Sequence, residues 1–537
     1  KYFQQCVMLL ADMKLKRSSA MINKKEIEGE IIDKEKYSFT SNNFIKEPLI
    51  FVIFGGGGDL AKRKLLPALY RLYYNDRLDC AFKIISAGLP ELSTEQYHIF
   101  IEESIKNYDS DIYEENILET FKENIEFIGL DFEVESDFNN LKQKIISTAD
   151  LMNVSKPNVI YYLAVPPQFS EIIINNLGKN KMQKIFNTRI VMEKPFGYDL
   201  KSAVQLNDKI QQVFNEKQIY RIDHYLGKET VQNILFFRFG NSIFEPLWNR
   251  SHIDHIQITV AESIGIGKRG EFYEKNGVIR DIVQNHIMQL IALVTMEPPV
   301  IFEAEEIRDE KVKVFKSLEK MSDEEVNENI VFGQYESGEI SGDKVESYRK
   351  EDKVDAHSTT PTFMAGKFNV NNWRWSGVPI YVRTGKRLPK KLTEIYIEFK
   401  QPPLKLFENK CDEINPNGLL FSLQPEEKTS LELNMKLPGV GNLPYSVEMA
   451  FNYNEEFDTG LLPAYERLLI DCMKGDLTLF ARRDGVEAMW ENIEPILEVA
   501  EEIPSKYFPN YKAGSWGPSE SDKLIKKDDR KWRVDGG

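Results

Sequence analysis

The strongest constraint on the fold is an apolar run that ends directly in four consecutive glycines. Residues 49–54 read LIFVIF, and residues 55–58 are all glycine. A short continuous run of this composition is typical of a parallel strand buried on both faces. The order strand, glycine turn, helix predicts the first half of a βαβ unit. The predicted helix has apolar residues at helical spacing, namely Leu65, Leu66, Leu69, Leu72 and Tyr73.

Further apolar segments extend this pattern. Strands are predicted at 82–87, 125–128, 159–165 and 189–192, with amphipathic helical stretches between them. This alternation predicts a doubly wound parallel sheet, the α/β Rossmann-like arrangement of a dinucleotide-binding domain. Right-handed crossovers place the carboxyl ends of the strands along one rim, where such sheets bind ligands.

After about residue 219 the rhythm changes to alternating apolar and polar residues, which predicts a larger α+β domain with a mostly antiparallel sheet. A chain of 537 residues also exceeds the length at which one hydrophobic core keeps growing. We therefore predict a poorly ordered extension at 1–45, a dinucleotide-binding domain at 46–218 and a substrate-binding domain at 219–537. The segments behind the last assignment are strands at 255–261, 379–383, 394–399 and 431–435, and helices at 277–296 and 464–474.

The charge balance excludes some classes of partner. The formal net charge is -15 at pH 7, so the surface repels nucleic acid and anionic lipid. No apolar run approaches the ~20 residues that span a bilayer. We therefore expect neither a nucleic-acid nor a membrane partner, and an anionic substrate must be met by a local basic cluster.

The cysteines indicate neither a disulfide framework nor a metal site. They lack CxxC spacing and are scattered along the chain. This pattern fits a reducing, cytoplasmic environment, and we expect no metal. The four residues are Cys6, Cys80, Cys411 and Cys472.

The glycine turn offers backbone N–H groups and a helix N-terminus to a phosphate. Taken alone, such a turn also fits a structural connection without a ligand. Three basic residues, Lys62, Arg63 and Lys64, occupy the first helical turn, where acids are usual. They favour an anion, and Lys64 is our candidate for a 2′-phosphate.

Three further segments carry candidate site residues. Lys194 follows a predicted strand, at the rim where substrate and nicotinamide meet. The segment RIDHYLGKE places His224, Tyr225 and Lys228 together as donors suited to a phosphate dianion. A cluster of five basic residues ends the predicted strand at 379–383 and indicates a second anion contact.

The predicted helix at 277–296 is apolar on nearly all sides, yet carries Asp281, Asn285, His286 and Gln289. Buried polar groups cost about 1 to 3 kcal/mol each when unpaired, so these need partners or a function. His286 is the candidate general base, because imidazole titrates near neutrality and a carboxylate can fix its tautomer. The alternative is a buried helix with its own hydrogen-bond network.

Together these segments resemble the glucose-6-phosphate dehydrogenase family, in order and spacing, from about residue 53 to residue 518. The RIDHYLGKE block is the most specific of them. The matching segments are GGGGDLAKRKLLPALY, YYLAVPP, EKPFG, RIDHYLGKE, GVIRDIVQNHIMQL, SGVPIYVRTGKRL, PAYERLLIDCMKGD and YKAGSWGP.

The resemblance implies oxidation of D-glucose 6-phosphate to 6-phospho-D-glucono-1,5-lactone, the first oxidative step of the pentose phosphate pathway. It implies His286 as general base and Asp223 as the carboxylate that orients it. It also implies a homodimer or homotetramer built through the large sheet of the second domain. The implied substrate contacts are Lys194, His224, Tyr225, Lys228, Glu262, Asp281, Lys386, Lys391 and Gln424. The expected cofactor contacts are Gly55, Gly58, Asp59, Leu60, Lys64, Ala164 and Lys194.

One departure from the family pattern concerns the cofactor. After the second strand the family often places an arginine on the adenine and 2′-phosphate of NADP, whereas this chain has Leu89. We expect NADP because of the three basic residues at 62–64, with NAD as the alternative.

Two other functions compete with this interpretation. A related sugar oxidoreductase of the glucose-fructose type also carries an EKP segment, but lacks the RIDHYLGKE cluster. A nucleotide-binding sensor without catalysis predicts loss of the acid-base pair, yet Asp223 and His286 are both present.

Overall fold

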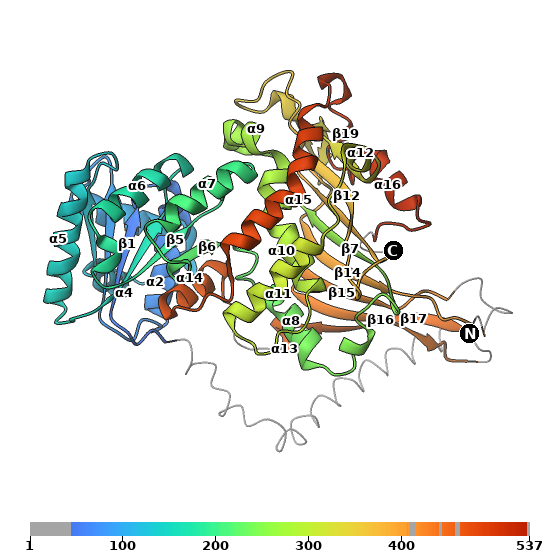
Figure 1. Cartoon of the computed structure of the whole chain (residues 1–537), viewed down its shortest axis with the longest axis horizontal. Coiled ribbons are helices and arrows are strands. Elements are labelled where there is room, and N and C mark those ends of the chain that lie inside the picture. Colours follow the sequence, from blue (N-terminus) through green and yellow to red (C-terminus); the bar gives the residue numbers. More distant parts are fainter. Residues whose placement is uncertain (1–43, 405, 407–413, 440–442, 457–461, 534–537) are drawn as a thin grey trace, which may run out of the picture.

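The structure is a computed structural model that describes residues 44–404, 406, 414–439, 443–456 and 462–533. The predicted extension at 1–45 therefore lies almost wholly outside the described residues. Two sheets organise the chain, and helices pack between and around them (Figure 1).

The first sheet has seven strands in the order β18-β6-β5-β4-β1-β2-β3. Strands β1 to β6 are parallel and follow the order 3-2-1-4-5-6 of dinucleotide-binding folds. All six residues of the central strand β1 are buried, as a strand covered by helices on both faces requires. Its strands are β1 (Leu49–Phe54), β2 (Phe82–Gly88), β3 (Ile125–Gly129), β4 (Asn158–Leu163), β5 (Asn187–Met192), β6 (Ile219–Ile222) and β18 (Phe480–Ala481).

The helices of this half connect and cover the parallel strands. The first of them begins with a π-helical turn, Ala61–Leu65, which continues into α2. Single strands separate most of the others, as the predicted alternation requires, but the helices Thr94–Tyr108 and Glu115–Lys122 follow one another without a strand between them. They are α2 (Leu66–Tyr74), α3 (Thr94–Tyr108), α4 (Glu115–Lys122), α5 (Glu135–Leu151), α6 (Pro167–Lys179) and α7 (Leu200–Gln211).

The second sheet has eight strands in the order β17-β16-β15-β14-β7-β13-β12-β8. Only the β7–β13 pair among them is parallel, so the prediction of a mostly antiparallel sheet is confirmed. The strands are β7 (Ile253–Ala261), β8 (Ile330–Gly333), β12 (Phe363–Asn369), β13 (Pro379–Gly385), β14 (Leu392–Phe399), β15 (Gly418–Gln424), β16 (Lys428–Lys436) and β17 (Pro444–Asn452).

A layer of helices lies between the two sheets, with the long helix α15 reaching across it (Figure 1). Two small sheets, β9 (Tyr335–Glu336) with β19 (Tyr511–Lys512) and β10 (Gly338–Ile340) with β11 (Asp343–Val345), complete the strands. Short 3₁₀ turns connect several elements. The helices are α8 (Glu229–Gly240), α9 (Gly270–Val278), α10 (Met288–Thr295), α11 (Ala304–Ser317), α12 (Asp323–Asn329), α13 (Tyr453–Glu456), α14 (Ala464–Lys474), α15 (Arg483–Glu501) and α16 (Ser519–Lys526). Within the described ranges, no helix combines the length and apolar character needed to cross a membrane.

Two strands that the sequence pattern did not assign to the first sheet belong to it. Residues 219–222, which we assigned to the second domain, form β6 and pair in parallel with β5. The two-residue strand β18, from far along the chain, then pairs antiparallel with β6 at the sheet's edge. The predicted boundary at residue 219 thus precedes the last parallel strand, and the division into two domains stays a prediction.

The predicted helix at 277–296 is less regular than expected. Gly277 has φ 57° and ψ -175°, which no helix contains, so α9 ends in a kink there. Residues Ile279–Ile287 then form a wide π-helical segment, called η7 here, that leads into α10. Segments of this kind are rare and often occur at functional sites, and this one carries Asp281 and His286.

Candidate active site

The predicted site residues meet where the two sheets face each other. Asp223 follows β6 and Lys194 lies just beyond β5, both at the carboxyl rim of the first sheet. From the other side, Glu262 follows β7 and Lys386 follows β13, two neighbouring parallel strands. The segment η7 lies between the two sets, so five elements converge on one site.

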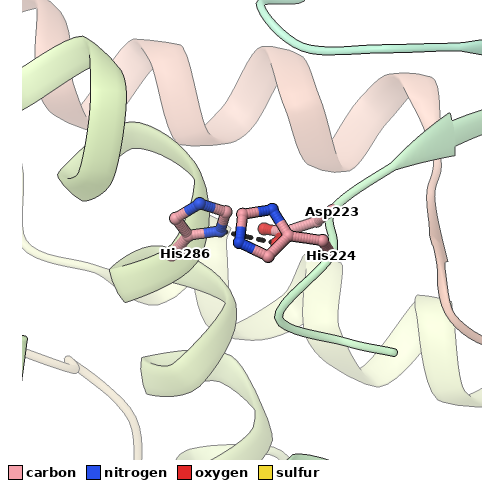
Figure 2. A group of neighbouring side chains, drawn as sticks. All are labelled: Asp223, His224 and His286. Carbon is pink, nitrogen blue, oxygen red and sulfur yellow. Dashed lines mark hydrogen bonds and ion pairs between the residues drawn. The ribbon is translucent and has the colours of Figure 1, made fainter. Parts of the chain in front are cut away.

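The centre of this site is a hydrogen-bonded pair, His286 and Asp223. Nδ1 of His286 lies 2.6 Å from Oδ1 of Asp223, and both side chains are almost fully buried. The same oxygen accepts the backbone N–H of Tyr225 at 2.9 Å. Figure 2 shows the two side chains approaching from different elements, the helical segment and the loop after β6. The carboxylate therefore fixes the orientation of the ring and favours the tautomer with its proton on Nδ1.

The second ring nitrogen of His286 faces Lys194. The Lys194 ammonium lies 2.8 Å from Nε2 and donates to the carbonyl oxygen of Asp281 at 3.0 Å. An ammonium has only donors, so Nε2 acts as an acceptor in this contact. His286 is thus a neutral imidazole whose lone pair points toward the lysine, which is the form that a general base requires.

The surroundings lower the pKa values of both members of this pair. Burial lowers the pKa of His286, and the Lys194 ammonium lowers it further against the opposing effect of Asp223. Burial alone raises the pKa of Asp223, but His286 beside it outweighs this and keeps that pKa well below its usual range. At neutral pH the structure therefore holds an ionised carboxylate next to an unprotonated imidazole.

Two aromatic side chains of the RIDHYLGKE segment enclose the His286 ring. Tyr225 stacks on it with ring centroids 4.1 Å apart, and the His224 ring meets it edge-on at 4.6 Å. Burial lowers the pKa of His224 far below its ordinary value, with His286 and Lys194 adding to the shift. His224 is therefore uncharged and offers hydrogen bonds rather than charge.

A second group of charged side chains, which includes Lys228, lies near these rings. The Lys228 ammonium lies 4.2 Å from the centroid of the Tyr225 ring. Burial lowers its pKa to about 8, and the nearby Lys391 lowers it further. Two cations that repel one another in this way are typical of a site built for an anion.

Gln424 lies at the same end of the second sheet as Lys391. It is the last residue of β15 and pairs with Thr393 of β14, which hydrogen-bonds to the Tyr225 hydroxyl. No side-chain hydrogen bond joins Gln424 to the His286 cluster among the described residues, so its role rests on position alone.

Asp281 connects two lysines across the site. Its carboxylate oxygens lie 3.6 Å from the ammonium of Lys194 and 3.6 Å from that of Lys386. Lys386 is 1% exposed and also pairs with Glu262. The pKa of Asp281 is raised by burial, but the two lysines outweigh this and leave it below its ordinary value. These side chains form a row of alternating charges that offers both donors and acceptors to sugar hydroxyls.

The glycine turn after β1 has the conformation that its sequence predicts. Gly55 has φ +83°, and a Cβ placed on it would lie 2.5 Å from the carbonyl oxygen of Ala164. The turn closes through a hydrogen bond from the N–H of Gly58 to the Gly55 oxygen at 2.9 Å. By contrast, Gly57 is exposed, and a Cβ on it would make only ordinary contacts at 3.9 Å with the side chains of Leu92 and Phe127.

Backbone N–H groups are available as donors on the exposed side of the glycine turn. Within the described chain, the N–H groups of Gly57, Asp59 and Leu60 make no backbone hydrogen bond, whereas that of Lys62 bonds to the Gly58 oxygen. Unpaired N–H groups at a helix start are what a pyrophosphate binds. The turn therefore fits a dinucleotide, and the purely structural alternative leaves these donors unexplained.

The three basic residues of the first helical turn differ in their contacts. Lys62 pairs with Glu103 at 2.7 Å, and Arg63 lies 3.4 Å from Asp59. Lys64 is exposed, and no ion pair engages it among the described residues. Of the three, Lys64 is thus the one most accessible to a 2′-phosphate.

Our sequence analysis missed a buried network behind Lys194. Glu193 accepts hydrogen bonds from the hydroxyls of Tyr162 at 2.6 Å and Tyr465 at 3.2 Å. Tyr465 in turn stacks on His224, with ring centroids 6.4 Å apart. Burial raises the pKa of Glu193. The EKP and PAYERLL segments contained the only signal, a charged residue and a tyrosine in otherwise apolar surroundings.

The side chains also resemble a metal site in composition. Asp223, His224 and His286 offer ligand atoms that all lie within 4.8 Å of one another. However, His286 already binds Asp223 through Nδ1, and the Lys194 ammonium faces its Nε2. A cation at this point would be repelled by that ammonium, so the geometry favours acid-base chemistry.

Comparisons with known sequences place these features in one family. The family description "Glucose-6-phosphate dehydrogenase, NAD binding domain" matches residues 52–233, and "Glucose-6-phosphate dehydrogenase, C-terminal domain" matches residues 235–533. Glucose-6-phosphate 1-dehydrogenase of Aggregatibacter actinomycetemcomitans is 44% identical over 494 residues, covering 91% of this chain and 98% of that protein. The corresponding protein of Bacillus subtilis is 42% identical over 488 residues, covering 90% and 98%.

Solved structures agree with the sequence comparison. A glucose-6-phosphate dehydrogenase in complex with its substrate glucose-6-phosphate superposes with a TM-score of 0.84 at 33% identity, covering 91% of this chain and 99% of that one. The glucose-6-phosphate 1-dehydrogenase of Mycobacterium avium gives a TM-score of 0.79 at 32% identity, covering 91% and 98%. Both sheets and the site between them thus lie within the region of similarity.

Proposed function

This chain belongs to the glucose-6-phosphate dehydrogenase family, and on that basis we propose roles for its residues and a preferred cofactor. It is an oxidoreductase that oxidises glucose 6-phosphate to 6-phospho-D-glucono-1,5-lactone and uses a nicotinamide dinucleotide. The observation that carries the residue assignment is the Asp223–His286 pair, whose free Nε2 faces Lys194.

We assign the proton transfer to His286. Nε2 accepts the proton of the anomeric hydroxyl, and Asp223 stabilises the imidazolium that forms while staying ionised itself. Without substrate, the Lys194 ammonium lies next to Nε2, where a substrate hydroxyl binds. When the substrate is bound, its hydroxyl replaces Lys194 as the partner of Nε2, and Lys194 donates to the sugar oxygen instead. When bound, the nicotinamide ring supplies the acceptor for the hydride of carbon 1.

The phosphate group is assigned to Lys228, His224 and Tyr225, with Lys391 at the rim. The Lys228 ammonium lies 4.2 Å from the centroid of the Tyr225 ring, and Lys391 is near enough to lower the pKa of Lys228. The sugar hydroxyls are assigned to Asp281, Glu262, Lys386 and Gln424, which lie on the second sheet and η7. A phosphate held at one end thus directs the other end of the sugar toward His286.

For the cofactor we propose NADP, with NAD as the alternative. Lys64 is exposed beside the glycine turn and can meet a 2′-phosphate. Leu89 is 63% exposed where the family often has an arginine, so one of the usual contacts is lacking. We expect a preference for NADP that is weaker than an arginine would give.

We also infer a homo-oligomer that associates through the outer strands of the second sheet. On β17, Tyr445 and Met449 are 59% and 62% exposed, and they pair with Met435 and Leu431 of β16 on the same face. A row of exposed apolar side chains on a sheet is typical of a protein interface. A cytoplasmic location stays a prediction; Cys80 and Cys472 are free thiols.

The test is a set of initial-rate measurements by absorbance of the reduced cofactor. We expect turnover of glucose 6-phosphate with NADP, slower turnover with NAD, and little with unphosphorylated glucose. Turnover of glucose at the same efficiency would contradict the phosphate assignment. Equal or better efficiency with NAD would contradict the cofactor assignment and leave the residue roles standing.

A further inference from the structure

A cavity of about 140 Å³ lies outside the active site, among α8, α10, α11 and α14. Its inner wall includes Leu226, which belongs to the loop after β6, and Lys311 of α11. Its outer wall includes Phe236 and Phe302, whose ring centroids are 5.2 Å apart. These two rings are 60% and 51% exposed, so the cavity has an aromatic edge at the surface.

Lys311 is the unusual member of this wall. It is 3% exposed, yet in the described part of the chain its ammonium makes neither an ion pair nor a hydrogen bond. Buried charges are normally paired, because an isolated one costs several kcal/mol of desolvation. Nε2 of Gln232, which also lines the cavity, is buried without a partner. Two donors thus face the cavity unused.

The two carboxylates on the same wall have partners other than Lys311. Asp471 binds Arg467 at 3.1 Å, and Asp476 accepts from the hydroxyl of Thr478 at 2.6 Å. The two unused donors call for a ligand with an acceptor, and the positive charge of Lys311 favours an anionic one. The remaining wall is largely apolar, with leucine, valine and isoleucine side chains. A ligand must therefore combine one anionic end with an apolar body.

The size of the cavity limits that body. A cavity of about 150 Å³ lined by apolar side chains holds one benzene molecule. The volume here is about 140 Å³, which admits a single ring or a chain of a few carbons. Phosphate or sulfate alone would leave the apolar wall and the aromatic edge without contacts.

From these observations we propose that the cavity beside Lys311 is a binding site for a small organic monocarboxylate with an apolar body about as large as a benzene ring. The carboxylate pairs with the Lys311 ammonium and accepts from Gln232. The apolar part lies against Leu235 and Leu293 and reaches toward Phe236. The site is separate from the glucose 6-phosphate site, and its existence does not depend on the residue roles proposed there.

The charge on Lys311 makes this binding dependent on pH. Burial lowers the pKa of Lys311 to about 8; the charge of Arg308 lowers it further, and that of Asp223 acts in the opposite direction. The other charged groups near the cavity are Arg467, Asp471 and Asp476. Because a carboxylate binds the ammonium form, its affinity is present below pH 8 and falls as the pH rises through that value.

The test is a calorimetric titration of the full chain with sodium benzoate, in the presence of saturating glucose 6-phosphate so that the phosphate site is filled. We expect a dissociation constant on the order of 1 mM at neutral pH. It should rise about tenfold between pH about 7 and about 9, as the lysine loses its proton. Benzyl alcohol, which has the ring without the charge, should bind at least about tenfold more weakly than benzoate.

Lys311→Met is the decisive variant, because methionine keeps much of the volume and removes an unpaired buried charge. It should abolish benzoate binding, whereas Lys313→Met on the same helix, where the side chain is 68% exposed, should leave it unchanged. Unchanged binding to Lys311→Met, equal binding of benzyl alcohol, or no measurable heat in the wild type would each overturn the proposal. If Lys311→Met does not fold, the pH dependence and the comparison of the two ligands in the wild type still decide it.

Discussion

At the scale of single residues, the mechanism that we propose depends on one hydrogen bond that leaves Nε2 of a histidine unprotonated. Asp223 binds Nδ1 of His286 at 2.6 Å, so Nε2 keeps its lone pair. Replacing His286 by alanine removes the base, and we expect kcat to fall about 10²- to 10⁴-fold. Binding of glucose 6-phosphate, measured by calorimetry, should change little. A kcat within a few-fold of the wild type would contradict the assignment.

Asp223→Asn tests the tautomer directly. An amide offers its NH₂ group or a weaker acceptor to Nδ1, so the ring can place its proton on Nε2 and lose its basic atom. We expect a loss in kcat of about 10²-fold or more, and a double variant with His286→Ala no worse than His286→Ala alone. Additive losses in the double variant would show that the two residues act separately.

The pKa of the His286 side chain predicts how the reaction rate depends on pH. Burial and the Lys194 ammonium lower its pKa below the ordinary value of 6.5. The active form is the unprotonated one, so kcat/KM should be constant at neutral pH and decrease as the pH falls through a midpoint below 6.5. A pH–rate profile measures this midpoint. A midpoint at or above 6.5 would mean that Asp223 outweighs burial.

Lys228 predicts the complementary effect on substrate binding. Removing a charge-assisted contact to phosphate costs about 1.5 to 3 kcal/mol. Lys228→Ala should therefore raise the KM for glucose 6-phosphate by about ten- to hundredfold and change kcat much less. Lys523→Ala, at a side chain 70% exposed on α16, is the matched control. A fall in kcat with an unchanged KM would assign Lys228 to the chemistry and not to binding.

The sequence identified most of these residues, but not their mutual contacts. His286 and Asp223 were paired through the family resemblance, while the residues alone indicated only a titratable group on an apolar helix. The Lys194–His286 contact joins positions 92 residues apart, and local spacing carries no information on such a distance. Glu193 and Tyr465 were missed for the same reason, since each gains its role only from the other.

At the scale of elements, the glycine turn contains one glycine that packing requires, Gly55, and one that we expect to serve cofactor binding, Gly57. A side chain on Gly55 would be forced against the Ala164 oxygen at 2.5 Å and into φ +83°. A side chain on Gly57 meets no protein atom nearer than 3.9 Å. Gly55→Ala should therefore lower the free energy of unfolding by about 1 to 3 kcal/mol or more, measured by denaturant titration. Gly57→Ala should leave stability within about 0.5 kcal/mol and raise the KM for the dinucleotide.

The opposite pattern, in which Gly57→Ala destabilises the fold and Gly55→Ala only weakens cofactor binding, would contradict this account of the turn.

The turn itself could be predicted because its signal is local: a buried apolar strand, four glycines and a helical period are contiguous. The helix at 277–296 shows the limit of local signals. Its apolar pattern predicts helix but does not distinguish an α-helical turn from the wider π-helical turn of η7. The segment carries the buried side chains of Asp281 and His286, whose partners lie on other elements.

At the scale of the whole molecule, the active site exists because two sheets present their strand ends to each other. The alternation of strands and helices predicted the first sheet, and the change of rhythm predicted the second. The return of the chain to form β18 against β6 was not predictable, because two residues carry no periodicity. That return places α14 and α15 between the sheets, and with them Tyr465 and the wall of the Lys311 cavity.

The last prediction concerns assembly and rests on one face of β17, the strand at the edge of the second sheet. Residues Tyr445, Val447, Met449 and Phe451 alternate along β17 and thus share one face. Met449→Arg places a charge in the middle of that face, and we expect a lower molar mass by light scattering coupled to gel filtration, with turnover per chain retained. Ser446→Arg, exposed on the opposite face of the same strand, is the control and should leave the molar mass unchanged. If both variants keep the wild-type mass, this face does not join the subunits, and the apolar row along β17 needs another explanation.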